Sequence, residues 1–325
     1  LPGVELSHDL LPQPGDVLWT PADWAWIGGL FDVLMPGLWH GVPVVAARMP
    51  KFSAEACCEI IKAACVRNVF FPPTALRMLR AEGARIEGLR SVACGGEPLG
   101  ADMLAWGREA LDVTINEFYG QTECNMVVSC CGALFDTPPG TTGRAVPGHE
   151  VAVIDEAGRS VEGAEGDIAV KRGTPVMFLG YWQNDAATQA KFRGDWMLTG
   201  DLGVANGPEI RFVARDDDVI TSAGYRLGPA EIEDCLMAHP SVAQVGVTGK
   251  PDDLRTEIVK AYVVLKPDVQ KDDALCEGLK AHVRARLGKH EYPREIAFLD
   301  ALPMTVTGKI IRKELRARAA AEVEV

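Results

Sequence analysis

The sequence of 325 residues lacks the features that mark several common protein classes. It has no spaced CxxC pair and no cluster of cysteine with histidine, which argues against a structural zinc site. Its most apolar segment, residues 24–39, contains Asp32 and is too short to span a bilayer, and we find no signal peptide. A GxxxxGK[ST] phosphate loop is also missing. Residues 137–143 only imitate one, because no lysine follows their second glycine.

Positive charge is scarce, because 33 Lys and Arg residues stand against 45 Asp and Glu residues, for a formal net charge of -12. This balance argues against a nucleic-acid partner. Small anions can still bind where Arg and Lys gather locally, so any nucleotide site must be locally basic. The length predicts about two domains, and 47% hydrophobic with 24% charged residues is typical of a globular protein.

The cysteines number nine, an odd count, and include the adjacent pairs Cys57-Cys58 and Cys130-Cys131. An odd number without paired spacing is typical of buried free thiols in a reducing compartment. We therefore expect free cysteines and a cytoplasmic protein.

The first part of the chain alternates short apolar runs with helix-like stretches. We expect strands at 17–20, 42–46, 68–71, 91–94 and 114–118, and helices at 24–38, 54–64, 74–81 and 101–110. This alternation predicts an α/β fold with a mostly parallel sheet covered by helices on both faces.

The pattern then changes to short strands separated by turns, at 148–154, 166–170, 196–198 and 210–213. We expect these to form a small barrel-like subdomain, followed by a small mobile α+β domain with helices at 272–287 and 309–320. The predicted boundaries give a large domain at 1–216, with its sheet part at about 1–142 and its barrel-like part at about 143–216, and a small domain at 217–325.

Two predicted strands end in residues suited to a ligand. Strand 91–94 runs into Gly95, Gly96 and Glu97, and strand 114–118 runs into residues 119–123. Ligands of parallel sheets bind beyond the carboxyl ends of the strands. Two glycines would let the backbone approach a flat group such as adenine, although a tight turn without a ligand is the alternative.

We interpret the segment 196–233 as the connection between the two domains. Asp201 follows the turn dipeptide Thr199-Gly200, where a carboxylate could accept two ribose hydroxyls or only cap a turn. Arg215 supplies a planar fork of donors for nucleotide oxygens. It precedes three adjacent carboxylates, Asp216 to Asp218, which we expect in a solvated turn.

Three motifs occur in a fixed order: FYGQTE at 118–123, the run TGD, RDDD and GYRLGPAEIE within 196–233, and PMTVTGKIIRKELR at 303–316. Together they resemble the adenylate-forming superfamily of acyl-CoA synthetases, luciferase and the adenylation domains of peptide synthetases. Residues 119–123 and the run Tyr292-Pro293-Arg294 look most like medium-chain acyl-CoA synthetases.

The resemblance implies an acid-thiol ligase of fatty acid metabolism. A carboxylate attacks the α-phosphate of ATP to give acyl-AMP and pyrophosphate, and the thiol of CoA then displaces AMP. The partners would be a small carboxylic acid, ATP with Mg²⁺, and CoA, without a prosthetic group. In this family the small domain rotates about a hinge between the two steps.

The same resemblance implies roles for individual residues. The nucleotide would contact Gly95, Gly96, Glu97, Glu117, Phe118, Tyr119, Gly120, Gln121, Thr122, Asp201, Arg215 and Arg226. Glu123 would bind Mg²⁺, Lys309 would be the catalytic cation of the first step, and Asp217 would be the hinge. CoA would contact Ala223, Gly224, Tyr225, Arg255, Tyr292, Pro293 and Arg294. Gly120 would leave room for a longer acyl group.

One departure matters: the family's Thr/Ser/Gly-rich phosphate loop ending in Lys is absent, and the chain opens at Leu1 without Met. We expect an incomplete piece that is not fully active alone. The alternatives are an aryl-CoA ligase, a ligase that loads a carrier protein, or a non-catalytic nucleotide-binding remnant. Arg255 and Arg294 favour free CoA over a carrier. The oligomeric state is left open, a homodimer being one alternative.

Overall fold

The computed structural model describes residues 1–47, 49, 52–223, 225–288, 290–305 and 309–323, and it leaves the side chains of Asp217 and Arg226 undescribed. The chain divides into two compact units, Leu1–Phe212 and Val213–Val325. Gly224, predicted to contact CoA, lies outside the described residues.

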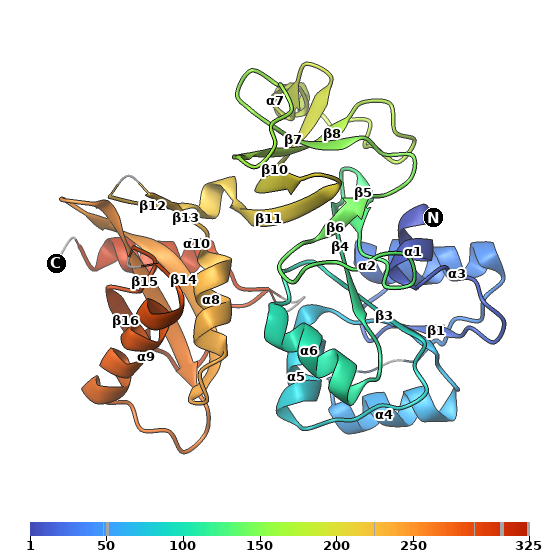
Figure 1. Cartoon of the computed structure of the whole chain (residues 1–325), viewed down its shortest axis with the longest axis horizontal. Coiled ribbons are helices and arrows are strands. Elements are labelled where there is room, and N and C mark those ends of the chain that lie inside the picture. Colours follow the sequence, from blue (N-terminus) through green and yellow to red (C-terminus); the bar gives the residue numbers. More distant parts are fainter. Residues whose placement is uncertain (48, 50–51, 224, 289, 306–308, 324–325) are drawn as a thin grey trace. The chain divides into compact units, whose positions relative to one another are not determined.

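The large sheet has the strand order β1-β2-β3-β4-β5-β6-β11-β10-β8-β7, and β9 pairs with β10. The strands are β1 (Leu18–Trp19), β2 (Asn68–Phe70), β3 (Ser91–Gly95), β4 (Ile115–Gln121), β5 (Asn125–Ser129), β6 (Gly143–Ala145), β7 (Val151–Ile154), β8 (Glu165–Lys171), β9 (Phe192–Arg193), β10 (Trp196–Asn206) and β11 (Glu209–Arg215). Strands β1 to β4 pair in parallel, and β4 pairs with β5 antiparallel (Figure 1).

Helices cover both faces of the parallel part of this sheet. They are α1 (Pro2–Ser7), α2 (Ile27–Gly29), the π-helical turn η1 (Leu30–Leu34), α3 (Met35–His40), α4 (Ala54–Ala63), α5 (Pro73–Ala81) and α6 (Ala101–Ala110). One core packs α4, α5 and α6 against strand residues such as Val92. The other packs Val4 of α1 and Val33 of η1 against Phe70 and Ala93. Strands buried on both faces need apolar side chains throughout, as the sequence has. The α/β fold is confirmed.

The predicted barrel-like region continues the same sheet. Its strands β6, β7, β8, β10 and β11 follow β5 along one open path of neighbours, and no closed barrel forms among the described strands. The short helix α7 (Asp185–Ala190) begins at Asn184, whose side chain accepts a hydrogen bond from the Ala187 N–H. The antiparallel strands are therefore an extension of the sheet that carries β3 and β4.

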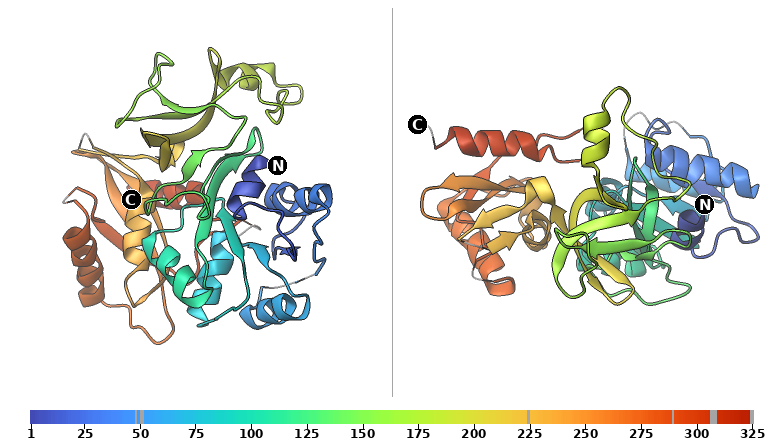
Figure 2. Two further views of the ribbon diagram at one scale, coloured as in Figure 1. Left: turned by 45° about the vertical axis from the view of Figure 1, so that its right-hand side comes forward. Right: turned by 90° about the horizontal axis from the view of Figure 1, so that it is seen from above.

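The second unit is a smaller sheet with the order β13-β12-β15-β14, and β16 pairs in parallel with β15. Its elements are the 3-10 turn η2 (Asp216–Asp218), β12 (Ile220–Ser222), β13 (Tyr225–Leu227), α8 (Pro229–Met237), β14 (Val242–Asp252), β15 (Thr256–Leu265), α9 (Asp273–Arg286), β16 (Glu295–Phe298) and α10 (Arg312–Ala321). Helices α8 and α9 share a core with one face of the sheet, and Leu315 of α10 packs with Tyr262 in another core. Figure 2 shows α9 and α10 on opposite sides of the sheet.

Two expectations for this unit are wrong. Asp218 does not lie in a solvated turn: its side chain is 8% exposed, and its Oδ1 accepts a hydrogen bond from Arg316 Nη1 at 2.6 Å. The two arginines that α10 presents, Arg312 and Arg316, neutralise it. The last helix begins at Arg312 and not at Lys309, because Ile310 forms a β-bridge with Met304.

All nine cysteines are free thiols, as predicted. Burial raises the pKa of several of them, including Cys57 and Cys124 to about 12, so these thiols stay protonated and unreactive at neutral pH. None of the described helices combines the length and the hydropathy that crossing a membrane would require.

Candidate functional site

The motif at residues 118–123 is shaped by a close approach of two strands. Residues 119–121 still belong to β4, and the exposed Thr122 and the half-buried Glu123 lie in the connection to β5. The β4–β5 register shifts between Tyr119 and Gly120. A Cβ atom on Gly120 would lie 1.9 Å from the backbone oxygen of Asn125, so the strand backbone fills this position. The close approach of β5 thus constrains this position to glycine, and the acyl-pocket role of Gly120 stays a prediction.

Asp201 lies inside β10 and not after a turn. The pairing of β10 with β8 shifts between Leu198 and Leu202, and Gly200 adopts a φ of +83° within this bulge. The Asp201 carboxylate accepts a hydrogen bond from the Tyr119 hydroxyl, with 2.5 Å between Oδ2 and Oη. Burial, followed by the charge of Asp201, raises the pKa of Tyr119 well above its usual range. The structure thus joins the FYGQTE and TGD motifs directly.

A lysine that the sequence did not suggest holds the same two strands together. Lys191 Nζ donates to Gln121 Oε1 at 3.2 Å and to the backbone oxygen of Thr199 at 3.0 Å. The Gln121 amide nitrogen also donates to the Thr199 oxygen, at 3.0 Å. Lys191 stands between a helix and a short strand and belongs to no sequence motif, so only its tertiary contacts show that it lies beside Gln121 and Thr199.

Glu123, the predicted metal ligand, is held at both its side chain and its backbone. The Tyr181 hydroxyl donates to Glu123 Oε1 at 2.6 Å, and the Phe178 N–H donates to the Glu123 backbone oxygen at 2.7 Å. The described residues contain no group of three or more His, Cys, Asp or Glu side chains that could hold a metal ion. A single carboxylate fits a Mg²⁺ ion that draws its remaining ligands from substrate phosphates and water.

The glycines at the end of β3 and after it allow close packing and the loop geometry. A Cβ atom on Gly95 would lie 2.6 Å from the ring of Phe118, so the absence of a side chain lets that ring approach the strand. Gly96 has a φ of +107°, which a side chain would strain. Glu97 pairs with Arg77 at 3.1 Å, and Glu117 Oε1 accepts a hydrogen bond from the Leu99 N–H at 3.0 Å. The two carboxylates thus position this loop.

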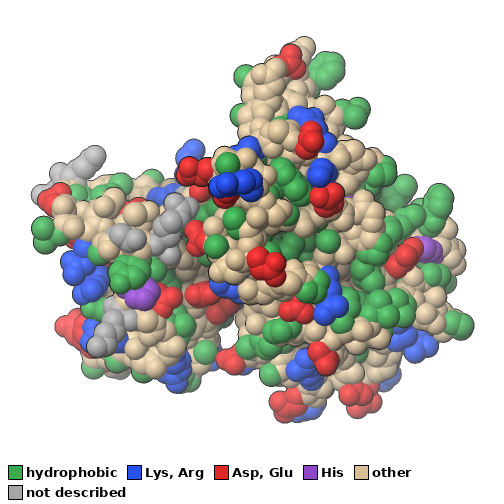
Figure 3. Space-filling model, turned by 45° about the horizontal axis from the view of Figure 1, so that its top comes forward, with side chains coloured by type: hydrophobic (Ala, Val, Ile, Leu, Met, Phe, Trp, Pro, Cys, Tyr) green, Lys and Arg blue, Asp and Glu red, His purple; other side chains and the backbone are tan. Residues whose placement is uncertain are grey.

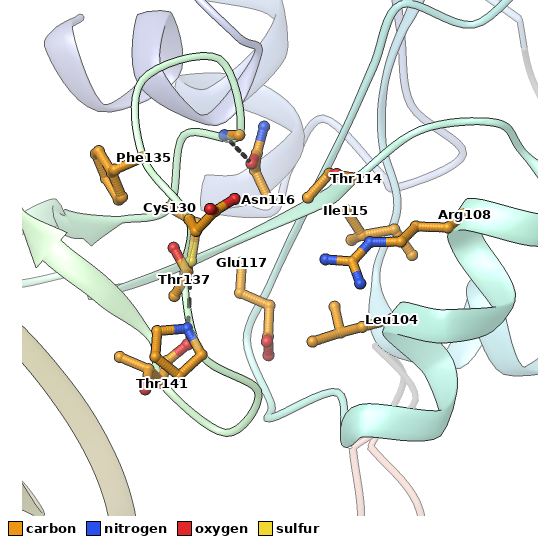
Figure 4. A pocket seen from close by; sticks show the side chains of 13 residues that line it. Leu104, Arg108, Thr114, Ile115, Asn116, Glu117, Cys130, Phe135, Thr137 and Thr141 are labelled. Atoms are coloured by element: carbon orange, nitrogen blue, oxygen red, sulfur yellow. Dashed lines mark hydrogen bonds between the residues drawn. The ribbon is translucent and has the colours of Figure 1, made fainter.

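A cavity of ≈ 200 Å³ lies in the first unit, lined by α6, the first residues of β4 and the segment 130–141. Figure 4 shows the Arg108 side chain extending from α6 toward β4, with Glu117 beside the cavity. Among the predicted nucleotide residues Glu117 alone lines it. Tyr119, Gln121 and Asp201 instead form the contacts described above.

The predicted CoA residues of the second unit make backbone, stacking and cation–π contacts. The Ala223 N–H donates to the Arg255 backbone oxygen at 2.9 Å. Tyr225 stacks on His290 at 4.2 Å between ring centroids, just before Tyr292-Pro293-Arg294. The Tyr292 ring lies under two guanidinium groups, those of Arg284 at 4.1 Å and Arg294 at 4.5 Å.

The predicted catalytic and hinge residues also belong to the second unit. Lys309 is half-buried, its N–H donates to Thr305 Oγ1 at 3.0 Å, and its backbone oxygen accepts from the Thr305 N–H. Arg215 is exposed at the end of β11, and Asp217 lies in η2. Arg226 lies in β13 opposite Thr221, with its side chain outside the described residues.

Charge is mixed over the surface of the described residues. Figure 3 shows Lys and Arg side chains interspersed with Asp and Glu on the face it draws. Among the described residues on this face, no large area carries charge of one sign alone.

Comparison with known families gives two matches. Residues 4–182 match the family described as AMP-binding enzyme, and residues 231–309 match the one described as AMP-binding enzyme C-terminal domain. The first match covers more than half of the chain and includes FYGQTE. The second includes Arg255, the run Tyr292-Pro293-Arg294 and Lys309.

Individual relatives point the same way. A mitochondrial acyl-coenzyme A synthetase of Rattus norvegicus is 36% identical over 315 residues, covering 94% of this chain and 55% of the relative. An acetyl-coenzyme A synthetase of Bacillus subtilis is 34% identical over 312 residues, covering 93% and 53%. The solved structure of the anthranilate CoA ligase AuaEII in complex with anthranoyl-AMP superposes with a TM-score of 0.89 at 26% identity, covering 99% of this chain and 63% of that one. The chain spans about half the length of the curated relatives it matches.

Proposed function

The chain belongs to the AMP-binding enzyme family, and from this premise we propose that it acts as an acyl-CoA synthetase. The reaction forms acyl-AMP and pyrophosphate from a carboxylic acid and ATP, and then acyl-CoA and AMP. The observation that carries the proposal is the hydrogen bond of 2.5 Å between Tyr119 and Asp201. It brings together two motifs that are 82 residues apart in the chain, as a nucleotide site needs.

The nucleotide site is proposed on the first unit. Asp201 would accept the ribose hydroxyls, with its carboxylate oriented by Tyr119. Thr122, exposed in the connection between β4 and β5, would donate its hydroxyl to a phosphate. Lys191 would hold Gln121 and the Thr199 backbone in place. Glu123 would hold Mg²⁺, which offsets the charge of the phosphates.

Lys309 is proposed as the cation of the first step alone. A carboxylate and the α-phosphate are both anions, so their approach requires a positive group where charge accumulates. A compact ammonium on a flexible stem can contact both oxygens. The thiol attack on acyl-AMP has a neutral mixed anhydride as its target and has no such repulsion to overcome. We propose Asp217 as the hinge about which the second unit rotates between the two steps.

CoA is proposed to bind the second unit through Ala223, Gly224 and Tyr225 for its thin chain, and through Arg255 and Arg294 for its phosphates. The hydrogen bond from the Ala223 N–H to the Arg255 backbone oxygen supports this grouping. The second candidate for the thiol substrate is a carrier protein, in which case free CoA would not be converted to a thioester. A reducing compartment such as the cytoplasm suits the nine free thiols.

The acid is proposed to be a medium-chain one, on the resemblance of residues 119–123 and 292–294. The structural similarity to an anthranilate CoA ligase favours an aromatic acid as the second candidate. Gly120 is proposed to leave room for the acyl chain, in addition to allowing the close approach of β5.

A substrate panel tests the proposal. The protein expressed from its complete coding sequence is supplied with ATP, CoA and, in turn, acetate, octanoate, benzoate and anthranilate, and AMP release and thioester formation are both measured. We expect CoA-dependent AMP release, largest with octanoate, and its loss in Asp201→Asn. Binding of AMP without turnover of any acid would instead identify a nucleotide-binding remnant. Turnover with a pantetheinylated carrier but not with CoA would identify a carrier-loading ligase.

A further inference from the structure

We propose that Tyr181 is a positioning residue that fixes the Glu123 carboxylate for the divalent cation of the nucleotide. The inference rests on the proposed function, because that function supplies the nucleotide and its cation. Tyr181 belongs to none of the three sequence motifs, and it lies 58 residues from Glu123 in the chain. The segment 174–184 that carries it therefore adds a component to the site that the motifs do not contain.

Two hydrogen bonds fix Glu123 from this one segment. Tyr181 Oη donates to the carboxylate oxygen Oε1 at 2.6 Å, and the Phe178 N–H donates to the backbone oxygen at 2.7 Å. One bond restrains the rotation of the side chain, and the other restrains the strand connection on which it stands. Charge-assisted bonds of this length are among the stronger hydrogen bonds in proteins.

Tyr181 is itself held by packing of its ring and by a hydrogen bond from its backbone to helix α7. The Tyr181 N–H donates to Thr188 Oγ1 at 2.9 Å, and the Thr188 hydroxyl donates to the Asn184 backbone oxygen at 3.0 Å. The Tyr181 ring packs on Phe178 at 5.0 Å, and Phe178 stacks on Phe192 of β9 at 6.0 Å with the planes 7° apart. A positioning group works only when its own orientation is fixed, and these contacts fix it.

A phenol suits this role better than a cation does. A lysine or arginine beside Glu123 would neutralise the carboxylate and compete with a divalent ion, whereas a neutral hydroxyl orients it and leaves its charge in place. A tyrosine hydroxyl ordinarily loses its proton only at about pH 10, so it is a donor in the physiological pH range.

The conservative variant Tyr181→Phe keeps the ring and its packing and removes only the hydroxyl. Manganese serves as the probe, because the electron paramagnetic resonance signal of free Mn²⁺ measures its uptake directly and independently of turnover. The protein from the complete coding sequence is titrated with Mn²⁺ in the presence of ATP. The affinity for AMP is measured separately by calorimetry in EDTA, and Trp182→Phe, at an exposed neighbour, is the matched control.

We expect Tyr181→Phe to weaken Mn²⁺ uptake about 10- to 100-fold, the range typical of lost outer-shell partners of a metal ligand. Its AMP affinity in EDTA should stay within about twofold of that of the unmodified protein, and Trp182→Phe should change neither quantity. In a Glu123→Gln background, adding Tyr181→Phe should have no further effect on Mn²⁺, because the group through which the hydroxyl acts is gone.

Three results would overturn the inference: unchanged Mn²⁺ uptake by Tyr181→Phe, an equal fall in AMP affinity in EDTA, or an undiminished effect in the Glu123→Gln background. An unmodified protein that binds neither AMP nor ATP-dependent Mn²⁺ would instead refute the proposed function itself. The two failures are therefore distinguishable.

Discussion

Gly120 connects the fold to the site, so the variant Gly120→Ala should disturb both. The added Cβ atom would lie 1.9 Å from the Asn125 backbone oxygen, 2.7 Å from its carbonyl carbon and 2.9 Å from the Met126 Cα. All three are backbone atoms, so relief requires β4 and β5 to separate. Forced overpacking of this kind costs about 1–3 kcal/mol. The strain falls on the connection that carries Thr122 and Glu123, so nucleotide affinity should fall as well.

The assay is guanidinium unfolding followed by tryptophan fluorescence. All seven tryptophans precede residue 213, so the signal reports on the first unit. The control is Gly132→Ala, an exposed position where the added Cβ would lie 3.3 Å from the nearest atom, a side-chain carbon of Thr114. We expect this control to change stability by less than about 0.5 kcal/mol. If Gly120→Ala proves as stable as the control, the close approach of β5 does not constrain this glycine.

Three further predictions concern other parts of the chain. Burial, followed by the charge of Arg90, lowers the pKa of His8 from 6.5 to about 3. The free energy of unfolding should therefore decrease as the pH falls from 6.5 toward 3, by up to about 1.4 kcal/mol per pH unit. In acid-unfolding curves, His8→Gln should flatten this dependence. Lys191→Met should weaken ATP binding about tenfold in calorimetry, because a charge-assisted hydrogen bond to Gln121 contributes roughly 1.5–3 kcal/mol, and unchanged affinity would remove Lys191 from the site. Asp218→Asn should speed hydrogen exchange across α10 by weakening its pair with Arg316, and unaltered exchange would contradict that anchor.

Local patterns predicted the elements that local physics determines. The strands at 68–70 and 91–95 were found because both of their faces are buried and their residues are apolar throughout. Helix α9 was found because its apolar stripe and its first residues agree, with Asp272 accepting a hydrogen bond from the Leu275 N–H.

Contacts between distant segments could not be found in this way. Thr199-Gly200-Asp201 has the composition of a turn, and only the pairing with β8 turns it into a bulge within β10. Tyr181 and Lys191 join the site through partners that lie 58 and 70 residues away, with no motif around them. The sequence therefore identified the motifs that we propose carry the chemistry, whereas the side chains that hold those motifs in place became visible only in the structure.

The proposed separation of the two steps is measured most directly by Lys309→Ala. In the protein from the complete coding sequence, ATP–pyrophosphate exchange reports the first step, and thioester formation from supplied acyl-AMP and CoA reports the second. We expect Lys309→Ala to abolish the exchange and to leave thioester formation largely intact. An equal loss of both activities would contradict the proposed separation.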